Sequence, residues 1–429
     1  MEMKHPDRKQ QPDLQTVDRV TLINPSEFIL DNGIPVYCIR AGTQEVTRIE
    51  FVIAAGTWMQ TQKLVAYFTS KMLTEGTKSR SGSEIYDFFD SYGAYISCEP
   101  EKDYVYLALY SLNKHLDKLL PVLAEILFEA SFPTQQLSVL MAKAKQDHIV
   151  SMQKVNYLAK VNFAAQLFGK DHPYGQHASD EDFDLIDAST LADFHKKYYH
   201  PGNFRIIVSG NYHENILKQL NLFFGITISD SSVADDFSQF EINSSGEKKI
   251  FIPKENALQS AIRLGKVMMN KSHPDFAPCF ILCTVLGGYF GSRLMTNIRE
   301  DKGYSYGIGA GMVSFRSEGF MYIASEVGAD VRKQALKEIY KEISKLTVEP
   351  VTDYELDLVK KYLAGSFMRS IDGPFALADK FVSVIDHTGD FASYYNHYLE
   401  VLQHITAAEL LELAGKYFSQ ETFYETVAG

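Results

Sequence analysis

Cysteine and tryptophan are scarce in this sequence, since its 429 residues include only four Cys and one Trp. So few cysteines in a chain of this length exclude a disulfide-stapled scaffold and are typical of a reducing compartment. Cys279 and Cys283 lie four residues apart in an apolar, helix-like stretch without His or Cys nearby. This setting favours core packing over metal binding.

Long hydrophobic runs and clusters of basic residues are also missing. No uncharged apolar run approaches the roughly 18 residues of a membrane-spanning helix. The chain carries 54 acidic against 42 basic side chains, a net charge of −12, which argues against nucleic-acid and membrane-surface partners because both need clustered Lys and Arg. Residues 1–20 mix both charge signs without an apolar segment, unlike a secretory signal or a transit peptide. We therefore expect a cytoplasmic protein with no nucleic-acid or membrane partner.

What is present is a globular composition, with 45% hydrophobic and 22% charged residues, over a length that predicts two or more domains. Between about residues 226 and 245 the chain turns polar, with many Ser and Asp and no sustained periodicity, which is typical of a linker. We predict an N-terminal domain at residues 1–225, a linker at 226–248 and a C-terminal domain at 249–429.

The two halves share one order of features, which indicates an internal repeat. In each, a strand-like run leads after equal spacing to a glycine, Gly76 or Gly287. A Gly-Ser pair then opens a helix, strand-like segments follow, and a long amphipathic helix is predicted over 116–127 and 331–346, the latter with Asp330 as its N-cap. The regular βαβ rhythm of a doubly wound sheet is absent. The predicted fold class is α+β, with two homologous halves, each an α/β sandwich of a mainly antiparallel sheet packed with helices.

Six short motifs follow one another along the chain. They are A-Y-F-T-S-K-M-L-T-E-G-T at 66–77, G-A-Y-I-S-C at 93–98, H-P-Y-G at 172–175, Y-H-P-G-N at 199–203, L-G-G-Y-F-G-S-R-L at 286–294 and R-E-D-K-G-Y-S-Y at 299–306. In order and spacing they resemble the M16 metallopeptidases, the pitrilysin, insulin-degrading and mitochondrial processing peptidase family. The resemblance covers nearly the whole chain from about Asn24 onward and implies a LuxS/MPP-like fold.

In that family, the first of these stretches carries the inverted zinc motif H-x-x-E-H. Two His at i and i+4 share a helix face and hold one zinc, while a Glu at i+3 reaches the metal-bound water as general base. Here the corresponding positions hold Tyr67, Ser70 and Lys71. Neutral Tyr is a poor zinc ligand, Ser is no base of suitable pKa, and an ammonium repels the cation.

The family's third zinc ligand, a Glu further along the chain, also has no counterpart. No glutamate occurs between Glu129 and Glu181, where Asp147 and His148 are the nearest candidates. We therefore expect this half to be metal-free. The polar face that carries Tyr67 either lines a cavity or is simply solvated.

The strand expected to receive substrate is altered as well. In the family, a peptide adds to this exposed sheet edge through main-chain hydrogen bonds. This chain has Ser97, Cys98 and Pro100 there, and Pro100 lacks an amide donor. We expect peptide docking on this half to be impaired.

The second half keeps more of the family pattern. Arg299 and Tyr306 match the Arg and Tyr that this half supplies to the family's active site. A fixed guanidinium and a phenol can bind a peptide carbonyl and stabilise the oxyanion that develops on it. Gly287, Gly288 and Ser292 are predicted to contact substrate in the glycine-rich loop. A helix-end cation, a strand aromatic and a merely flexible loop are the simpler alternatives.

Together these features resemble the zinc-free subunit of a two-subunit M16 peptidase. The resemblance implies a partner subunit with an intact H-x-x-E-H motif, which would hold the zinc, and a peptide substrate enclosed between the two. This chain would hold no cofactor and would be inactive alone. The alternative is a non-proteolytic structural or peptide-binding M16-like core protein, as a homodimer or in a larger complex. The sequence does not distinguish a heterodimer from a homodimer.

Overall fold

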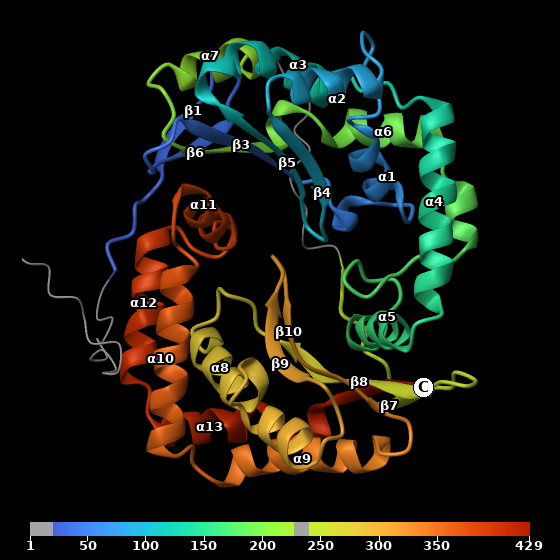
Figure 1. Cartoon of the computed structure of the whole chain (residues 1–429), viewed down its shortest axis with the longest axis vertical. Coiled ribbons are helices and arrows are strands. Elements are labelled where there is room, and N and C mark those ends of the chain that lie inside the picture. Colours follow the sequence, from blue (N-terminus) through green and yellow to red (C-terminus); the bar gives the residue numbers. More distant parts are fainter. Residues whose placement is uncertain (1–19, 227–239) are drawn as a thin grey trace, which may run out of the picture.

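Two β-sheets organise the chain, one in each half, as Figure 1 shows. The computed structural model describes residues 20–226 and 240–429. The first sheet has the strand order β1-β2-β6-β3-β5-β4, and the second has the order β7-β11-β8-β10-β9. The strands are β1 (Ser26–Ile29), β2 (Pro35–Arg40), β3 (Val46–Ile53), β4 (Tyr95–Pro100), β5 (Val105–Leu112), β6 (Phe204–Gly210), β7 (Lys249–Ile252), β8 (Gln259–Met268), β9 (Ile308–Ser314), β10 (Gly319–Gly328) and β11 (Tyr424–Ala428).

With β1 set aside, the two sheets have the same topology. The first remaining strand of each sheet pairs in parallel with the last, β2 with β6 and β7 with β11. The other neighbours in both sheets are antiparallel. The predicted fold class, two homologous halves that each pack a mainly antiparallel sheet with helices, is confirmed. Of the predicted linker, residues 227–239 lie outside the described residues.

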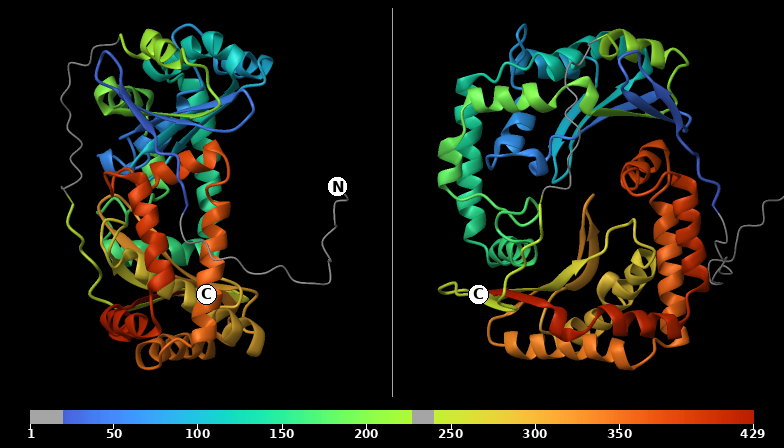
Figure 2. Two further views of the ribbon diagram at one scale, coloured as in Figure 1. Left: turned by 90° about the vertical axis from the view of Figure 1, so that its left-hand side faces the viewer. Right: turned by 180° about the vertical axis from the view of Figure 1, so that it is seen from behind.

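Helices cover the sheets on the outside and connect them along the sides. The helices of residues 20–226 are α1 (Val65–Met72), α2 (Gly82–Ser91), α3 (Leu116–Phe128), α4 (Thr134–Met152), α5 (Val155–Phe168), α6 (Ala188–Tyr198) and α7 (Ile216–Phe224). Those of residues 240–429 are α8 (Phe276–Cys283), α9 (Arg332–Val348), α10 (Asp353–Arg369), α11 (Pro374–Val382), α12 (Phe391–His404) and α13 (Ala407–Tyr417). Seen from behind, α4 forms one side of the molecule and α10 with α12 the other (Figure 2).

Short helical turns join these elements. Five are 3-10 turns: η1 (Thr57–Met59), η2 (Asn113–His115), η3 (Glu181–Leu185), η4 (Pro201–Asn203) and η7 (Gln420–Thr422). Two consecutive π-helical turns, η5 (Thr284–Gly288) and η6 (Met295–Asp301), follow α8.

Local sequence explains where several helices begin. Ser81 caps α2, because its side chain accepts the Glu84 amide while the Glu84 carboxylate accepts the Ser81 amide. The two long helices predicted over 116–127 and 331–346 are present as α3 and α9. The predicted cap of α9 is wrong: its N-cap is Val331, whose amide donates to the Gly328 carbonyl, and no side chain caps this end.

Each sheet is covered on both faces along its central strands, and the helix on the inner face comes from the other half. Residues alternate along β3, where Phe51 faces the core formed with the first half's own helices. The next residue, Val52, faces Ala378 and Phe381 of α11. In the second sheet, Ala261 of β8 packs against α5 in the same way. Each half therefore contributes one helix that covers the inner face of the other half's sheet. The sequence pattern did not predict this arrangement.

Charged groups also join the halves. Arg205 Nη1 of β6 lies 2.6 Å from Asp386 Oδ1, and Arg48 Nη1 of β3 lies 2.6 Å from Asp379 Oδ1 of α11. At the β9–β10 turn, the Arg316 amide donates to the Asp103 carboxylate. These contacts fix the two sheets relative to one another.

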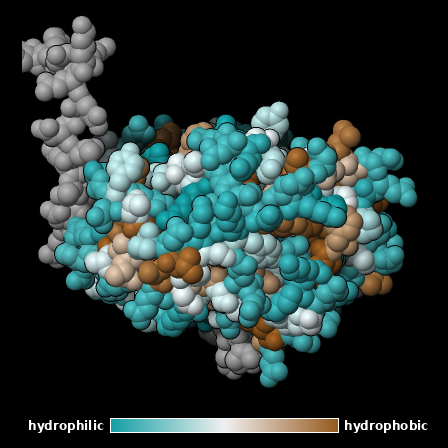
Figure 3. Space-filling model, turned by 90° about the horizontal axis from the view of Figure 1, so that it is seen from below, coloured by the Kyte–Doolittle hydropathy of each residue, from teal (hydrophilic) through white to brown (hydrophobic). Residues whose placement is uncertain are grey.

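The polar surface and the buried cysteines are both usual for a globular protein. The face seen from below is mostly hydrophilic, with apolar side chains scattered over it (Figure 3). Within the described ranges, no helix combines the length and apolar character needed to cross a bilayer. Cys279 and Cys283 of α8 are fully buried and free, and burial raises the pKa of the Cys279 thiol to about 12. Both cysteines pack in the core, as predicted.

Candidate functional site

Helix α1 carries the three positions where the M16 motif would place zinc chemistry. Tyr67 is half-buried, and Ser70 is fully buried with its hydroxyl donating to the Tyr67 carbonyl at 2.8 Å. A buried, neutral hydroxyl that donates to its own helix is far too weakly basic to take a proton from a water molecule.

Lys71 crosses from α1 to the edge strand β4. Its Nζ donates to the Cys98 carbonyl oxygen at 2.9 Å and to Glu99 Oε2 at 2.8 Å. The ammonium therefore uses a main-chain acceptor of the strand on which the family pattern would seat a peptide. Pro100, at the end of the same strand, has no amide to donate. Both features disfavour the addition of a further strand at this edge.

Of the polar face of α1, Tyr67 lines a cavity of about 460 Å³, whereas Ser70 is buried and Lys71 bonds to β4, so the face as a whole neither lines a cavity nor is simply solvated. Tyr67 shares this cavity with Asp147 and His148 of α4, the nearest candidates for the third ligand. His148 Nε2 faces Asp180 Oδ1 at 3.7 Å. The fold thus brings together the positions of a zinc site, but with different side chains.

These side chains do not fit zinc. The second ligand position holds an ammonium that is already bonded to two oxygens, and the base position holds a buried serine. In the part of the chain that the structure describes, no group of three or more His, Cys, Asp and Glu side chains is placed to hold a metal ion. No step can be derived through a metal in this half.

Two other buried histidines of the first half, His195 and His172, have structural surroundings. The His195 ring stacks on Tyr199, and its Nε2 lies 2.9 Å from the Leu127 carbonyl oxygen. The His172 ring stacks on Phe168, and burial, with a contribution from Lys102, lowers its pKa to about 4. Neither arrangement resembles a ligand pair.

In the second half, the glycine-rich loop packs directly on the sheet. A Cβ added to Gly287 in η5 would lie 2.6 Å from the Ala310 amide nitrogen of β9, so only glycine permits this approach. Gly288 is exposed beside it. Ser292 is only 1% exposed, and its buried hydroxyl has no hydrogen-bond partner among the described residues. Of these three predicted contact residues, Gly288 alone is exposed to solvent.

Arg299 and Tyr306 lie on either side of the turn that connects η6 to β9. The Arg299 guanidinium carbon lies 4.6 Å from the centre of the exposed Phe290 ring, a cation–π contact that positions it. In the described residues, Arg299 makes no ion pair or side-chain hydrogen bond, which leaves its donors available. Tyr306 is 94% exposed. The turn itself is fixed, because Gly303 has a φ of +64° and the Ser305 hydroxyl lies 2.7 Å from the Glu326 carbonyl oxygen.

The structure does not bring the two predicted sites of this chain into contact. Tyr67, Ser70 and Lys71 belong to α1 of the first half, and Arg299 and Tyr306 flank a loop of the second half that packs on α9 and β9. The site positions predicted from sequence form two separate surfaces. Sequence reasoning missed the Lys71 bridge to β4, because Cys98 and Glu99 are close to it only after folding.

Comparison with protein families identifies both halves. Residues 36–169 match the model of the insulinase-type M16 peptidases, and residues 186–363 match the model described as the M16 peptidase inactive domain. The chain belongs to the M16 peptidase family. Within this family the H-x-x-E-H motif is missing from the chain, as the positions on α1 show.

Relatives in bacteria support the same placement. A Bacillus subtilis protein named as an uncharacterised zinc protease, YmxG, is 25% identical over 365 residues, covering 83% of this chain and 85% of the relative. A Helicobacter pylori protein named as a non-peptidase homologue is 23% identical, covering 70% of each chain. The crystal structure of an M16 inactive domain from Pseudomonas fluorescens superimposes with a TM-score of 0.81 over 95% of this chain and 98% of its own, at 24% identity. The last similarity concerns the fold.

Proposed function

We propose that this M16 chain is the zinc-free subunit of a two-subunit peptidase, to which it supplies Arg299 and Tyr306. A partner subunit with an intact H-x-x-E-H motif would hold the zinc, and a peptide would lie between the two. The observation that carries the proposal is that Arg299 has unused donors and Tyr306 is exposed on the same fixed turn, while the metal positions of α1 are chemically disabled.

The chemistry follows from charge development during amide hydrolysis. Attack of water on the peptide carbonyl places negative charge on its oxygen, and preorganised donors stabilise that charge. The Arg299 guanidinium offers several N–H donors in a fixed plane, and the Tyr306 phenol offers one more. Neither group can generate the attacking water. Activity therefore requires the partner's metal site.

In this proposal, the first half leaves its sheet edge closed to a peptide. The Lys71 ammonium occupies the Cys98 carbonyl on β4, so this chain's own edge strand is not offered to a peptide. The four cysteines are free, which supports our expectation of a reducing, cytoplasmic location.

The test uses the full chain, alone and co-purified with an H-x-x-E-H subunit encoded in the same genome. We expect no stoichiometric zinc and no cleavage of a fluorogenic peptide by the chain alone, and both in the complex. One zinc per purified chain, or peptide cleavage by the chain alone, would overturn the proposal.

A matched arginine controls for surface charge. Arg332 stacks on Phe251 at 4.2 Å, much as Arg299 stacks on Phe290, but it lies on α9 near the opposite edge of the sheet. Arg299→Ala should lower kcat of the complex, whereas Arg332→Ala should leave it unchanged. Equal effects of the two substitutions would assign Arg299 a general electrostatic role only.

The scaffold alternative has one observation in its favour, the description of the Helicobacter pylori relative as a non-peptidase homologue. A structural core protein would associate with copies of itself or other chains without gaining peptidase activity. Mass measurement of the purified complex, together with the zinc and cleavage assays, separates the two functions.

A further inference from the structure

A second cavity, of about 330 Å³, lies between α8, α10, α12 and the end of β9 in the second half. It is remote from α1, and neither Arg299 nor Tyr306 lines it. Its wall combines two lysines with aromatic and hydroxyl side chains. They include Lys271, Lys380, Phe280, Ser366, Tyr394 and Tyr398.

The two lysines lack carboxylate partners. Among the described residues, neither Lys271 nor Lys380 forms an ion pair, although fifteen such pairs occur elsewhere in this part of the chain. Lys271 Nζ makes one hydrogen bond, to the Ser383 carbonyl at 2.9 Å, and so retains two donors. Lys380 makes only a cation–π contact with Tyr395, at 5.9 Å.

Like charges in a partly buried cavity repel each other and are poorly hydrated. Burial, together with the charge of Lys380, lowers the pKa of Lys271 to about 8, and burial also lowers the pKa of Lys380. His387, beside Lys271, is neutral near pH 7, because burial and Lys271 lower its pKa to about 4, so it neither adds to nor offsets the positive charge of the lysines. An anion in the cavity would relieve both the repulsion and the desolvation.

The aromatic side chains of the cavity wall indicate the chemistry of the rest of the ligand. The rings of Phe280, Tyr394 and Tyr398 offer apolar surface, and burial raises the pKa of both tyrosines, so their phenols stay neutral. In the described part of the chain, neither phenol has a hydrogen-bond partner, so both can donate to an anion. A bare inorganic ion would leave the apolar wall unused.

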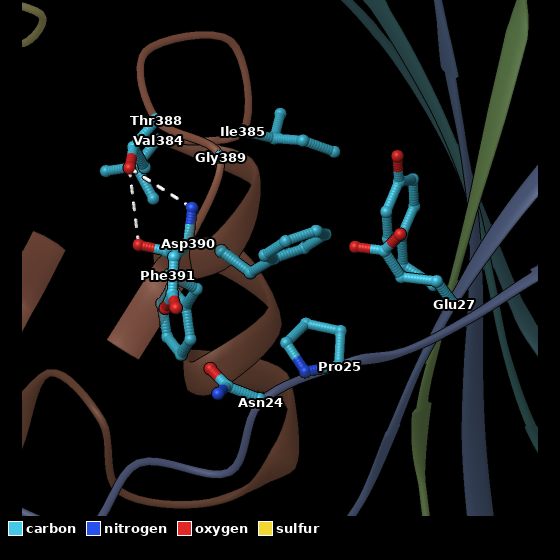
Figure 4. A pocket seen from close by; sticks show the side chains of 11 residues that line it. Asn24, Pro25, Glu27, Val384, Ile385, Thr388, Gly389, Asp390 and Phe391 are labelled. Atoms are coloured by element: carbon cyan, nitrogen blue, oxygen red, sulfur yellow. Dashed lines mark hydrogen bonds between the residues drawn. The ribbon is translucent and has the colours of Figure 1, made fainter. Parts of the chain in front are cut away.

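A pocket of similar size shows what distinguishes this one. The cavity in Figure 4, of about 310 Å³, lies between the start of the first sheet and the α11–α12 loop and is also polar. Two of its polar groups are already bonded: Asp390 accepts the Ser393 amide as the cap of α12, and Asn24 Oδ1 accepts the Ala392 amide. Capping of a helix explains the bonded groups of that pocket. The C-terminal end of α11 explains the two lysines only in part, since Lys380 lies in its last turn and Lys271 donates to the carbonyl of its C-cap, Ser383. Among the described residues, no carboxylate pairs with either lysine.

We propose that the cavity between α8, α10 and α12 binds an organic carboxylate with an apolar body, with Lys271 and Lys380 holding the carboxylate and the aromatic wall holding the body. The cavity volume suits a ligand of one or two amino-acid residues. Two sources share this chemistry: the C-terminal end of a short peptide and a free aryl carboxylic acid. The site is independent of the peptidase role, since it shares no residue with it.

The test is titration calorimetry of the full chain with four probes. They are the peptide Gly-Gly-Phe, its C-terminal amide, 3-phenylpropanoate and inorganic phosphate. We expect the peptide acid to saturate one site, with binding weakened about tenfold or more in the amide, because a charge-assisted contact is lost. Equal binding of 3-phenylpropanoate identifies a free acid as sufficient, and weaker binding identifies a peptide end. Saturation by phosphate alone, equal binding of acid and amide, or no binding by either acid overturns the proposal.

Variants locate the binding site. Lys271→Met and Lys380→Met keep the aliphatic stem and should each weaken the acid about tenfold or more, whereas Lys380→Arg should retain binding. Lys360→Met is the matched control, because Lys360 of α10 also donates to a main-chain carbonyl, that of Gln403, but does not line the cavity. Thermal unfolding of each variant, with and without the acid, separates loss of the ligand from loss of the fold. An unchanged affinity in both methionine variants would refute the assignment.

Discussion

The two halves use equivalent elements, yet they treat the edge of their sheets differently. In the first half, the Lys71 side chain of α1 bonds to the Cys98 carbonyl of the edge strand β4. In the second, η5 approaches β9 so closely that only Gly287 fits against Ala310. The same topology therefore has different outcomes in the two halves. In the first half, the Lys71 side chain occupies the edge of the sheet. In the second, a closely packed loop presents the Arg299 guanidinium and the Tyr306 phenol. The fold sets where a site can form, and a few side chains set which half has one.

The largest expected effect tests whether side chains alone disable the first half. Tyr67→His combined with Lys71→His places two imidazoles one helical turn apart, the first of them in the cavity that Asp147 and His148 also line. We expect this variant to bind one zinc with a dissociation constant below about 1 μM, equivalent to about 8 kcal/mol, while the wild type binds none. Metal analysis after dialysis measures the zinc content of the variant and of the wild type.

A further change serves as control. Adding Asp147→Ala, His148→Ala and His177→Ala should abolish zinc binding by the double variant, because the cavity lining then offers no other carboxylate or imidazole as third ligand. If the double variant takes up no zinc at all, differences in backbone geometry between the halves matter more than the side chains.

The second prediction concerns what holds the halves together. Arg205 and Asp386 are both largely buried, so Asp386→Asn leaves an uncompensated guanidinium between the sheets. We expect a loss of about 3–5 kcal/mol in the free energy of unfolding, measured by urea denaturation. The exposed Lys361–Asp357 pair is the control, where Asp357→Asn should cost less than about 0.5 kcal/mol.

This stabilisation should depend on pH. Burial alone would raise the pKa of Asp386, but Arg205, with Tyr104 and Arg316, holds it below its ordinary value of 3.8. A carboxyl with a lowered folded-state pKa stabilises the fold above its unfolded pKa and loses this contribution as the pH falls through the folded value. The difference between wild type and Asp386→Asn should therefore shrink below about pH 4. A difference that stayed constant down to pH 2 would contradict the ion pair.

The third prediction compares the two halves in the proposed two-subunit peptidase. Arg299→Ala should raise the barrier for peptide cleavage by about 2.7–4 kcal/mol, or about 100- to 1000-fold in kcat, because an oxyanion donor is removed. Lys71→Ala should change kcat less than about twofold, since Lys71 contacts only its own strand. Similar losses in the two variants would mean that both halves contact substrate.

The smallest expected effect concerns the close approach of η5 to β9. Gly287→Ala forces a Cβ against the Ala310 backbone and should destabilise the chain by about 1–3 kcal/mol. Gly365→Ala in α10, where an added Cβ meets nothing within 4 Å, should instead stabilise it by about 0.4–1 kcal/mol. Denaturant unfolding of both variants distinguishes strain at the loop from a general effect of replacing glycine.

The sequence predicted those features that depend on local pattern. The repeated order of strands and helices follows from periodicity, and α2 begins at Gly82, where the Gly-Ser pair was predicted to open a helix. The absence of the zinc motif can be recognised from the sequence because Tyr67, Ser70 and Lys71 lie within one helix. The roles of Arg299 and Tyr306 remain predictions.

Features that depend on distant contacts were not predictable. Lys271 and Lys380 meet in one cavity although more than a hundred residues separate them, and nothing in either neighbourhood marks a pocket. The Asp330 cap failed for the opposite reason, because a suitable residue type was present but a main-chain turn through Val331 begins the helix instead. The capping propensity of a residue indicates that it can cap a helix, but tertiary packing determines whether it does so in the folded chain.

The exchange of α5 and α11 has a consequence for how such a chain can be divided. A polypeptide consisting of one half alone would leave one face of its sheet bare, with Val52 or Ala261 in water. Two fragments, 1–226 and 240–429, should therefore be insoluble separately but assemble when expressed together. A half-length ancestor could have met the same requirement only by pairing with a second copy, each covering the other. On this view the duplication fused a dimer into one chain, and afterwards its two members were free to diverge.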